Sequence, residues 1–229
     1  MSDVILFGFE RSTYVNIARL VLIAKGVAFE FSDTEAAMQA GQWTLHPFGR
    51  VPALRHKDLL LWETAAIVTY VDEAFPGPPL QPTSVRDRAA MRAWMGSVDS
   101  YFYPWIVFRL VHERLVFREL GIDADEGVVA GALPEVRRIL DVLERHLAAN
   151  PTWLAGDAPT LADYFMLPSI TALGFTEEGR GMLAQTPAIG RWLASMATLP
   201  AVQQLRAMLP PPAPIEHARQ WVQTHRAAA

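Results

Sequence analysis

Cysteine is absent from the 229 residues, which excludes disulfide bonds and metal sites built on thiolates. The sequence also lacks a phosphate-binding loop, a dinucleotide-binding glycine fingerprint and a Gly-x-Ser-x-Gly nucleophile turn. None of its six histidines stands at metal-ligand spacing from another, and His112-Glu113 is not followed by the second histidine of a zinc-binding helix. We therefore expect no metal. The missing cysteines fit the reducing cytoplasm, where we expect the protein to be located.

Charged residues and long apolar runs are scarce as well. Charged residues make up 19% of the chain, the net charge is −4 and the pI is about 5.9, so we do not expect a nucleic-acid partner. No stretch approaches the ~20 consecutive apolar residues that span a membrane, and the N-terminal MSDVILFG does not have the pattern of a secretory signal. Hydrophobic residues make up 51%, enough for the core of one large domain or two small ones.

The first third of the chain predicts alternating strands and helices. An apolar run predicts a buried strand at Val4–Phe7, and a helix follows Ser12-Thr13 and stops at Lys25-Gly26. A half-buried strand is expected at 27–32 and a short helix at 34–41. Two apolar runs around the turn 56–58 predict a β-hairpin, after which another helix begins. The predicted order is β-α-β-(α)-β-β-α.

The hairpin and the helix after it contain three notable positions. Proline cannot donate to a strand ladder, so Pro52 belongs at the first residue of its strand, where a tight entry would use a cis bond. Thr64 is the candidate N-cap of the following helix, and the helix dipole favours a negative Glu63 beside it. From the residues alone, Glu63 and Thr64 either cap the helix or bind a ligand at its N-terminus.

Proline and glycine gather at 76–83, which indicates a linker, and the chain beyond it has helical patterns. One long pattern covers 86–120; it is interrupted at Gly96 and is expected to bend or break at Pro104. Thr160-x-x-Asp163 has the form of a capping box, which gives Asp163 a role in folding rather than in catalysis. Further segments are expected in this order: an amphipathic helix at 134–150, short helices at 187–199 and 200–209, a proline spacer at 210–214 and a last amphipathic segment at 215–225.

Two motifs at a characteristic separation resemble the glutathione S-transferase family. The family carries N-P-x-G-x-[VI]-P-A-L followed by E-S-x-A-I, and the matching segments here are HPFGRVPAL at 46–54 and ETAAI at 63–67. His46 replaces asparagine, Arg50 replaces glutamine, and Thr64 replaces serine but keeps the hydroxyl. Residues 153–163 resemble the family's second signature. The resemblance implies a thioredoxin-like α/β domain at 1–76, a linker at 77–86, an all-α domain at 87–229 and a homodimer.

The resemblance also implies how glutathione, the co-substrate, would bind. Backbone groups of Val51, before a cis Pro52, would pair with its cysteinyl part like an added strand. Glu63 would receive the α-ammonium, and the hydroxyl and N–H of Thr64 would receive the α-carboxylate. Relatives hold the glycyl carboxylate with basic residues near 39–43. This chain has none there, so Arg50 or His46 would compensate.

Ser12 is the candidate catalytic residue, in the layout of serine-type, theta-, phi- or zeta-like and bacterial members of the family. A free thiol has a pKa near ~8.5, and a hydroxyl that donates to sulfur at a helix N-terminus stabilises the thiolate. Thr13 and Tyr14 are alternative donors, and Ser12 as an ordinary N-cap is the alternative interpretation. Tyrosine-type members use a tyrosine at the end of the first strand, whereas Phe7-Gly8-Phe9 has no hydroxyl there.

A small hydrophobic electrophile is the expected second substrate. Candidates for its pocket are Phe9, Tyr103, Ile106 and Arg109, although aromatic stripes at helical spacing more often belong to a core. The absence of cysteine excludes chemistry through a mixed disulfide with the protein. Conjugation is the predicted reaction. Glutathione-dependent isomerisation, dehalogenation or peroxide reduction, and a non-catalytic module that binds ligands or proteins, are the alternatives.

Overall fold

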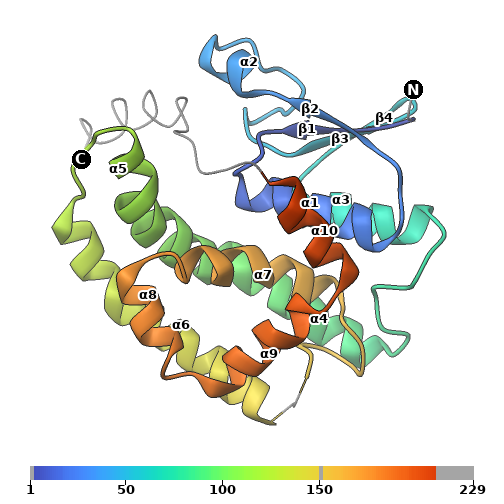
Figure 1. Ribbon diagram of the computed structural model, residues 1–229. Coiled ribbons are helices and arrows are strands. Elements are labelled where there is room, and N and C mark those ends of the chain that lie inside the picture. Colours follow the sequence, from blue (N-terminus) through green and yellow to red (C-terminus); the bar gives the residue numbers. More distant parts are fainter. Residues whose placement is uncertain (1–2, 150–151, 210–229) are drawn as a thin grey trace. The chain divides into compact units, whose positions relative to one another are not determined.

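The computed structural model describes residues 3–149 and 152–209, which fall into two compact units (Figure 1). One unit holds described residues 3–78 and 204–209, and the other holds 79–203. The predicted proline spacer and last amphipathic segment, at 210–225, lie outside the described residues.

The first unit is built on a four-stranded mixed sheet with the strand order β2-β1-β3-β4. Strand β1 pairs parallel with β2 and antiparallel with β3, and β3 pairs antiparallel with β4. In Figure 1, helices α1 and α3 lie side by side along one face of this sheet. The elements in chain order are β1 (Val4–Gly8), α1 (Thr13–Ala24), β2 (Glu30–Asp33), α2 (Glu35–Gln39), β3 (Ala53–His56), β4 (Leu59–Trp62) and α3 (Thr64–Ala74). The predicted thioredoxin-like order is confirmed.

Helix α1 ends as its sequence predicts. Gly26 has a φ of +68°, a conformation that glycine adopts without the steric cost of a Cβ atom. Lys25 at the C-cap extends its ammonium to Asp72 of α3, with an Nζ–Oδ1 distance of 3.0 Å and both side chains almost fully buried. This ion pair ties the end of α1 to α3.

Strand β2 differs from its prediction. The strand expected at 27–32 covers Glu30–Asp33. The N–H of Val27 donates to the carbonyl of Leu22, so the first residues of the apolar alternation close the end of α1 instead of pairing with β1.

The second unit is helical, as predicted, and its centre is α7 (Leu161–Leu173), most of whose residues are buried. Helix α4 packs against α7 and η1, and α6 packs against η1 and α9. The elements are α4 (Val85–Ser97), η1 (Val98–Val116), α5 (Phe117–Glu119), α6 (Glu126–Ala149), α7, α8 (Glu177–Leu183), α9 (Pro187–Ala197) and α10 (Pro200–Met208), whose last residues group with the first unit.

Two helix boundaries in this unit correct the sequence-based expectation. Of the bend or break expected at Pro104, the break does not occur, since η1 continues through this residue to Val116. Helix η1 has the wider π winding, in which an N–H donates to the carbonyl five residues earlier, as Phe117 does to His112. This wider winding opens the turn that a proline ring would crowd. Helix α6 begins at Glu126 rather than 134, since the Asp125 carboxylate accepts the N–H groups of residues 127 and 128.

Within the described residues no helix is long and apolar enough to span a bilayer.

Candidate glutathione site

Strand pairing brings three loops to one edge of the sheet in the first unit. Phe7 near the end of β1 lies opposite Ala53 at the start of β3, and Ala53 lies opposite Trp62 at the end of β4. The segments that follow Gly8, precede Ala53 and follow Trp62 therefore meet at this edge. They carry Ser12, Val51-Pro52 and Glu63-Thr64, so the topology gathers the predicted site residues of this unit.

Ser12 is the N-cap of α1, with φ −66° and ψ 127°. Its N–H donates to the carbonyl of Phe9, and its Oγ accepts the N–H of Val15 over a long 3.4 Å. The capping interpretation is therefore confirmed. It is compatible with a catalytic role, because an oxygen that accepts one hydrogen bond still has its own O–H to donate.

Gly8 sets how closely β1 approaches the first turn of α1. A Cβ atom placed on Gly8 would lie 2.3 Å from Cγ2 of Val15, well inside van der Waals contact. Val15 is the residue whose N–H caps onto Ser12. The absence of a side chain at Gly8 therefore allows the turn that carries Ser12 to pack this closely against β1.

The peptide bond between Val51 and Pro52 is cis, at the entry to β3 where the sequence indicated it. Pro52 is buried and Val51 is half-buried. The segment before them is held by Trp43, whose indole N–H donates to the carbonyl of Arg50 at 2.8 Å. The Arg50 side chain is exposed.

Glu63 has an unusual backbone conformation, with φ +66° and ψ 118°. It occupies the N-cap position of α3, where its carbonyl accepts the N–H of Ile67. Thr64, the predicted N-cap, is instead the first helical residue and is 6% exposed. Positive φ is rare for a residue with a side chain, and such strain concentrates at functional sites. The exposed Glu63 carboxylate thus stands at the N-terminus of α3.

His46 lies in the same region as a buried ring, 5% exposed. Its Nδ1 accepts the N–H of Phe48 at 3.2 Å. Burial lowers the pKa of His46 below its ordinary value; Glu63 raises this pKa and Arg50 lowers it. Burial and the hydrogen bond that Nδ1 accepts both favour the uncharged ring, so His46 is less suited than Arg50 to act as the cation that compensates at the glycyl carboxylate. The sequence did not predict that His46 is buried. The only signal at this position was that His46 replaces the asparagine of the family motif.

The candidate residues for the electrophile pocket belong to both units. Phe9 lies in the loop between β1 and α1, whereas Tyr103, Ile106 and Arg109 lie in η1. Ile106 is fully buried and Tyr103 is half-buried. Arg109 is exposed, and its guanidinium lies over the Trp105 ring, 4.7 Å from the ring centroid.

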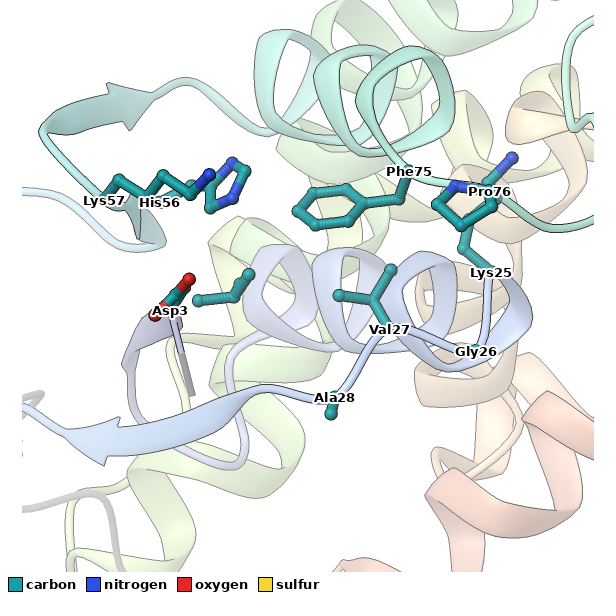
Figure 2. A pocket seen from close by; sticks show the side chains of 10 residues that line it. Asp3, Lys25, Gly26, Val27, Ala28, His56, Lys57, Phe75 and Pro76 are labelled. Atoms are coloured by element: carbon teal, nitrogen blue, oxygen red, sulfur yellow. The ribbon is translucent and has the colours of Figure 1, made fainter. Parts of the chain in front are cut away.

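A separate cavity of about 550 Å³ lies at the opposite end of the sheet (Figure 2). Val4 at the start of β1, the 25–28 connection, the hairpin turn at 56–57 and the end of α3 line it. Figure 2 shows the rings of His56 and Phe75 facing each other, with centroids 4.8 Å apart. None of the predicted site residues lines this cavity. In the part of the chain that the structure describes, no group of three or more histidine, aspartate or glutamate side chains is placed to hold a metal.

Comparison with known proteins agrees with this fold. Residues 6–79 match the model of the glutathione S-transferase N-terminal domain, and residues 98–200 match that of the glutathione S-transferase C-terminal domain. Glutathione S-transferase 3 of Zea mays is 33% identical over 222 residues, covering 93% of this chain and 98% of that protein. A glutathione S-transferase of Hyoscyamus muticus is 30% identical over 193 residues, covering 81% and 90%.

Among solved structures, the apo form of glutathione S-transferase III superposes with a TM-score of 0.83 at 32% identity, covering 92% of this chain and 99% of that one. The fold, the sheet edge and these relatives together lead to one conclusion: the chain belongs to the glutathione S-transferase family.

Proposed function

We propose that this chain is a serine-type glutathione transferase, similar to the theta-, phi- and zeta-like members, in which Ser12 stabilises the thiolate of glutathione for attack on a small hydrophobic electrophile. One observation carries the proposal. The Ser12 hydroxyl caps α1 at the same sheet edge as the cis Val51-Pro52 bond and the N-terminus of α3.

The γ-glutamyl end of glutathione binds at the start of α3. The Glu63 carboxylate pairs with the α-ammonium, and the N-terminus of α3 with the Thr64 hydroxyl receives the α-carboxylate. The cysteinyl part pairs with the backbone of Val51 before Pro52, as an added strand does. Arg50, the residue before Val51, is the cation that binds the glycyl carboxylate. This arrangement directs the sulfur toward the turn after β1.

Ser12 completes the reaction centre. Its oxygen accepts the Val15 N–H while its O–H donates to the sulfur, and the positive end of the α1 dipole favours the anion. Each pKa unit by which the thiolate is stabilised is worth ~1.4 kcal/mol. With a chloronitrobenzene, the thiolate attacks the ring carbon that carries chlorine, a C–S bond forms, and chloride leaves with the electrons of the C–Cl bond.

The test is turnover of a chloronitrobenzene by Ser12→Ala. We expect a loss of ~10²-fold or more, because the donor to the developing thiolate is removed. The matched control is Ser84→Ala: Ser84 caps α4 in the same way, its Oγ accepting the N–H of Asp87 at 3.3 Å. Both variants lose about 1 kcal/mol of stability as N-cap substitutions, but Ser84→Ala retains wild-type turnover. Wild-type turnover in Ser12→Ala would contradict the role of Ser12. Binding of glutathione with no turnover in the wild type, and no further loss in Ser12→Ala, would favour a non-catalytic module.

A further inference from the structure

Trp43, in the loop between α2 and β3, ties that loop to the sheet. Its indole Nε1–H donates to the carbonyl of Arg50 at 2.8 Å. Its half-buried ring packs against Phe7 of β1, with the ring centroids 6.0 Å apart. The guanidinium of Arg55 in β3 lies over the same Phe7 ring, 5.2 Å from its centroid. Trp43 therefore holds a loop carbonyl with a donor whose ring rests on the buried side chain of a sheet residue.

The carbonyl that accepts this hydrogen bond shares its peptide group with the N–H of Val51. The peptide bond between Arg50 and Val51 is trans, and a trans peptide group is planar, so its C=O and its N–H point in opposite directions. A hydrogen bond to the Arg50 oxygen thus sets the direction in which the Val51 N–H points. This N–H has no acceptor among the residues that the structure describes, and it is available to a ligand.

The same hydrogen bond affects how strongly Val51 can donate. A hydrogen bond accepted by an amide oxygen polarises the amide and makes its N–H a better donor. Water could also solvate the Arg50 oxygen, but a water molecule would leave the peptide group free to rotate through the flanking φ and ψ angles. The packed indole both polarises the group and fixes its orientation.

We propose that Trp43 is a positioning residue of the glutathione site, whose indole N–H orients the peptide group between Arg50 and Val51 so that the Val51 N–H is aimed at the carbonyl of the cysteinyl part. The inference rests on the proposed function. It gives a role in binding to a residue that lies outside both sequence motifs and that does not itself contact the ligand.

The test is Trp43→Phe, which keeps an aromatic ring against Phe7 but removes the indole donor. Binding of S-methylglutathione, which has no thiol to ionise, is measured by calorimetry on the full chain. We expect Kd to rise about fivefold, the size of one net hydrogen bond. In turnover of a chloronitrobenzene, KM for glutathione should rise by a similar factor while kcat changes by less than about twofold, because the lost contact serves the bound substrate and the transition state alike.

The matched control is Trp192→Phe in the second unit. It also removes an indole N–H that donates at short distance, here to Oδ1 of Asp163 at 2.9 Å. This variant should lose stability but keep the wild-type Kd for S-methylglutathione. The comparison separates the orientation of Val51 from a general loss of stability.

A shortened ligand shows which part of glutathione depends on Trp43. The amide of S-methyl-γ-glutamylcysteine keeps the cysteinyl carbonyl but has no glycyl residue, so Trp43→Phe should raise its Kd by the same factor. A rise that occurs only with the tripeptide would mean that the indole binds the glycyl carboxylate, and this result would overturn the inference.

A wild-type Kd in Trp43→Phe overturns the inference but leaves the proposed function standing. Failure of the wild type to bind S-methylglutathione contradicts the proposed function itself, and the inference with it. A second measurement does not depend on how Trp43→Phe folds: the NMR signal of the Val51 amide proton in the wild type. It should move downfield when S-methylglutathione binds, as for a proton that gains an acceptor, and an unchanged signal overturns the inference.

Discussion

Glu63 combines two properties that rarely occur together, a side chain with a charge and a backbone at φ +66°. The sequence predicted its place beside a helix N-terminus, because Glu-Thr follows an apolar strand. It did not predict the positive φ or that Glu63 itself is the N-cap, because no local preference of glutamate favours either. The strain persists because the flanking β4 and α3 fix both ends of the junction.

Replacing Glu63 with glycine tests whether this strain serves binding. Glycine adopts positive φ freely, so Glu63→Gly should raise the free energy of unfolding by up to about 1 kcal/mol. The same variant should weaken glutathione binding about tenfold or more, since it loses a charge-assisted hydrogen bond. Denaturant unfolding and calorimetry measure the two effects.

Lys57 provides the matched control, as it is another non-glycine residue with positive φ, +55°, and lies in the hairpin turn away from the candidate site. Lys57→Gly should show a similar gain in stability with unchanged affinity for glutathione. If both variants bound glutathione like the wild type, Glu63 would not be the receptor of the α-ammonium.

At the scale of elements, the first turn of α1 is positioned by its contact with β1. Gly8→Ala would place a methyl group 2.3 Å from Val15 Cγ2, so either the Val15 side chain or the turn that carries Ser12 must shift. We expect a loss of about 1–3 kcal/mol of stability, as for overpacking in a core, together with lower turnover. In contrast, Gly96→Ala in α4 meets no atom within 4 Å and should stabilise its helix by about 0.5–1 kcal/mol. Unchanged turnover in Gly8→Ala would show that the position of this turn does not limit the reaction.

Helix α7 depends on Asp163, which is fully buried. Its Oδ1 accepts the N–H of Leu154 and the indole N–H of Trp192, and its Oδ2 accepts the N–H and the hydroxyl of Thr160. Asp163→Asn would turn an NH2 group toward one pair of these donors, so the free energy of unfolding should fall by about 3 kcal/mol. The exposed Asp141→Asn on α6 is the control and should change it by less than about 0.5 kcal/mol.

The capping box was predicted from Thr160 and Asp163, because it is a local pattern of four residues. The hydrogen bond between Trp192 and Asp163 was not predicted, because the two residues are 29 positions apart and no local sequence pattern indicates such a contact. The same distinction explains the errors at element ends. The sequence located β1, α1 and the hairpin, whose apolar periods and stop signals are local. It misplaced the start of β2 and the start of α6, where a turn and a side-chain cap override the pattern. It also did not predict the wider winding with which η1 passes Pro104 without a break.

At the scale of the whole molecule, the predicted glutathione residues Ser12, Arg50, Val51, Pro52, Glu63 and Thr64 all belong to the first unit. Five of these residues lie in the two motifs, Ser12 was chosen from its place at the start of the first helix, and the sheet topology brings their segments to one edge; their roles at glutathione stay predictions. The residues proposed for the electrophile are divided between the units, and their assignment stays a prediction, since an aromatic helix face is the same signal for a core and for a pocket.

A homodimer is the expected assembly. Sedimentation at micromolar concentration should give twice the 25.4 kDa mass of the chain. The apolar Phe48 side chain, 72% exposed in the turn beside His46, is a surface that association would cover. A mass of one chain at all concentrations would contradict this expectation without affecting the proposed chemistry.

The most direct test of the proposed chemistry is the pKa of the thiol of bound glutathione, titrated through the ultraviolet absorbance of the thiolate. In the wild type and in Ser84→Ala this pKa should lie well below the ~8.5 of a free thiol. In Ser12→Ala it should rise by ~1–2 units, which corresponds to the loss of one hydrogen bond to the anion. The same thiol pKa in the wild type and in Ser12→Ala would contradict the account.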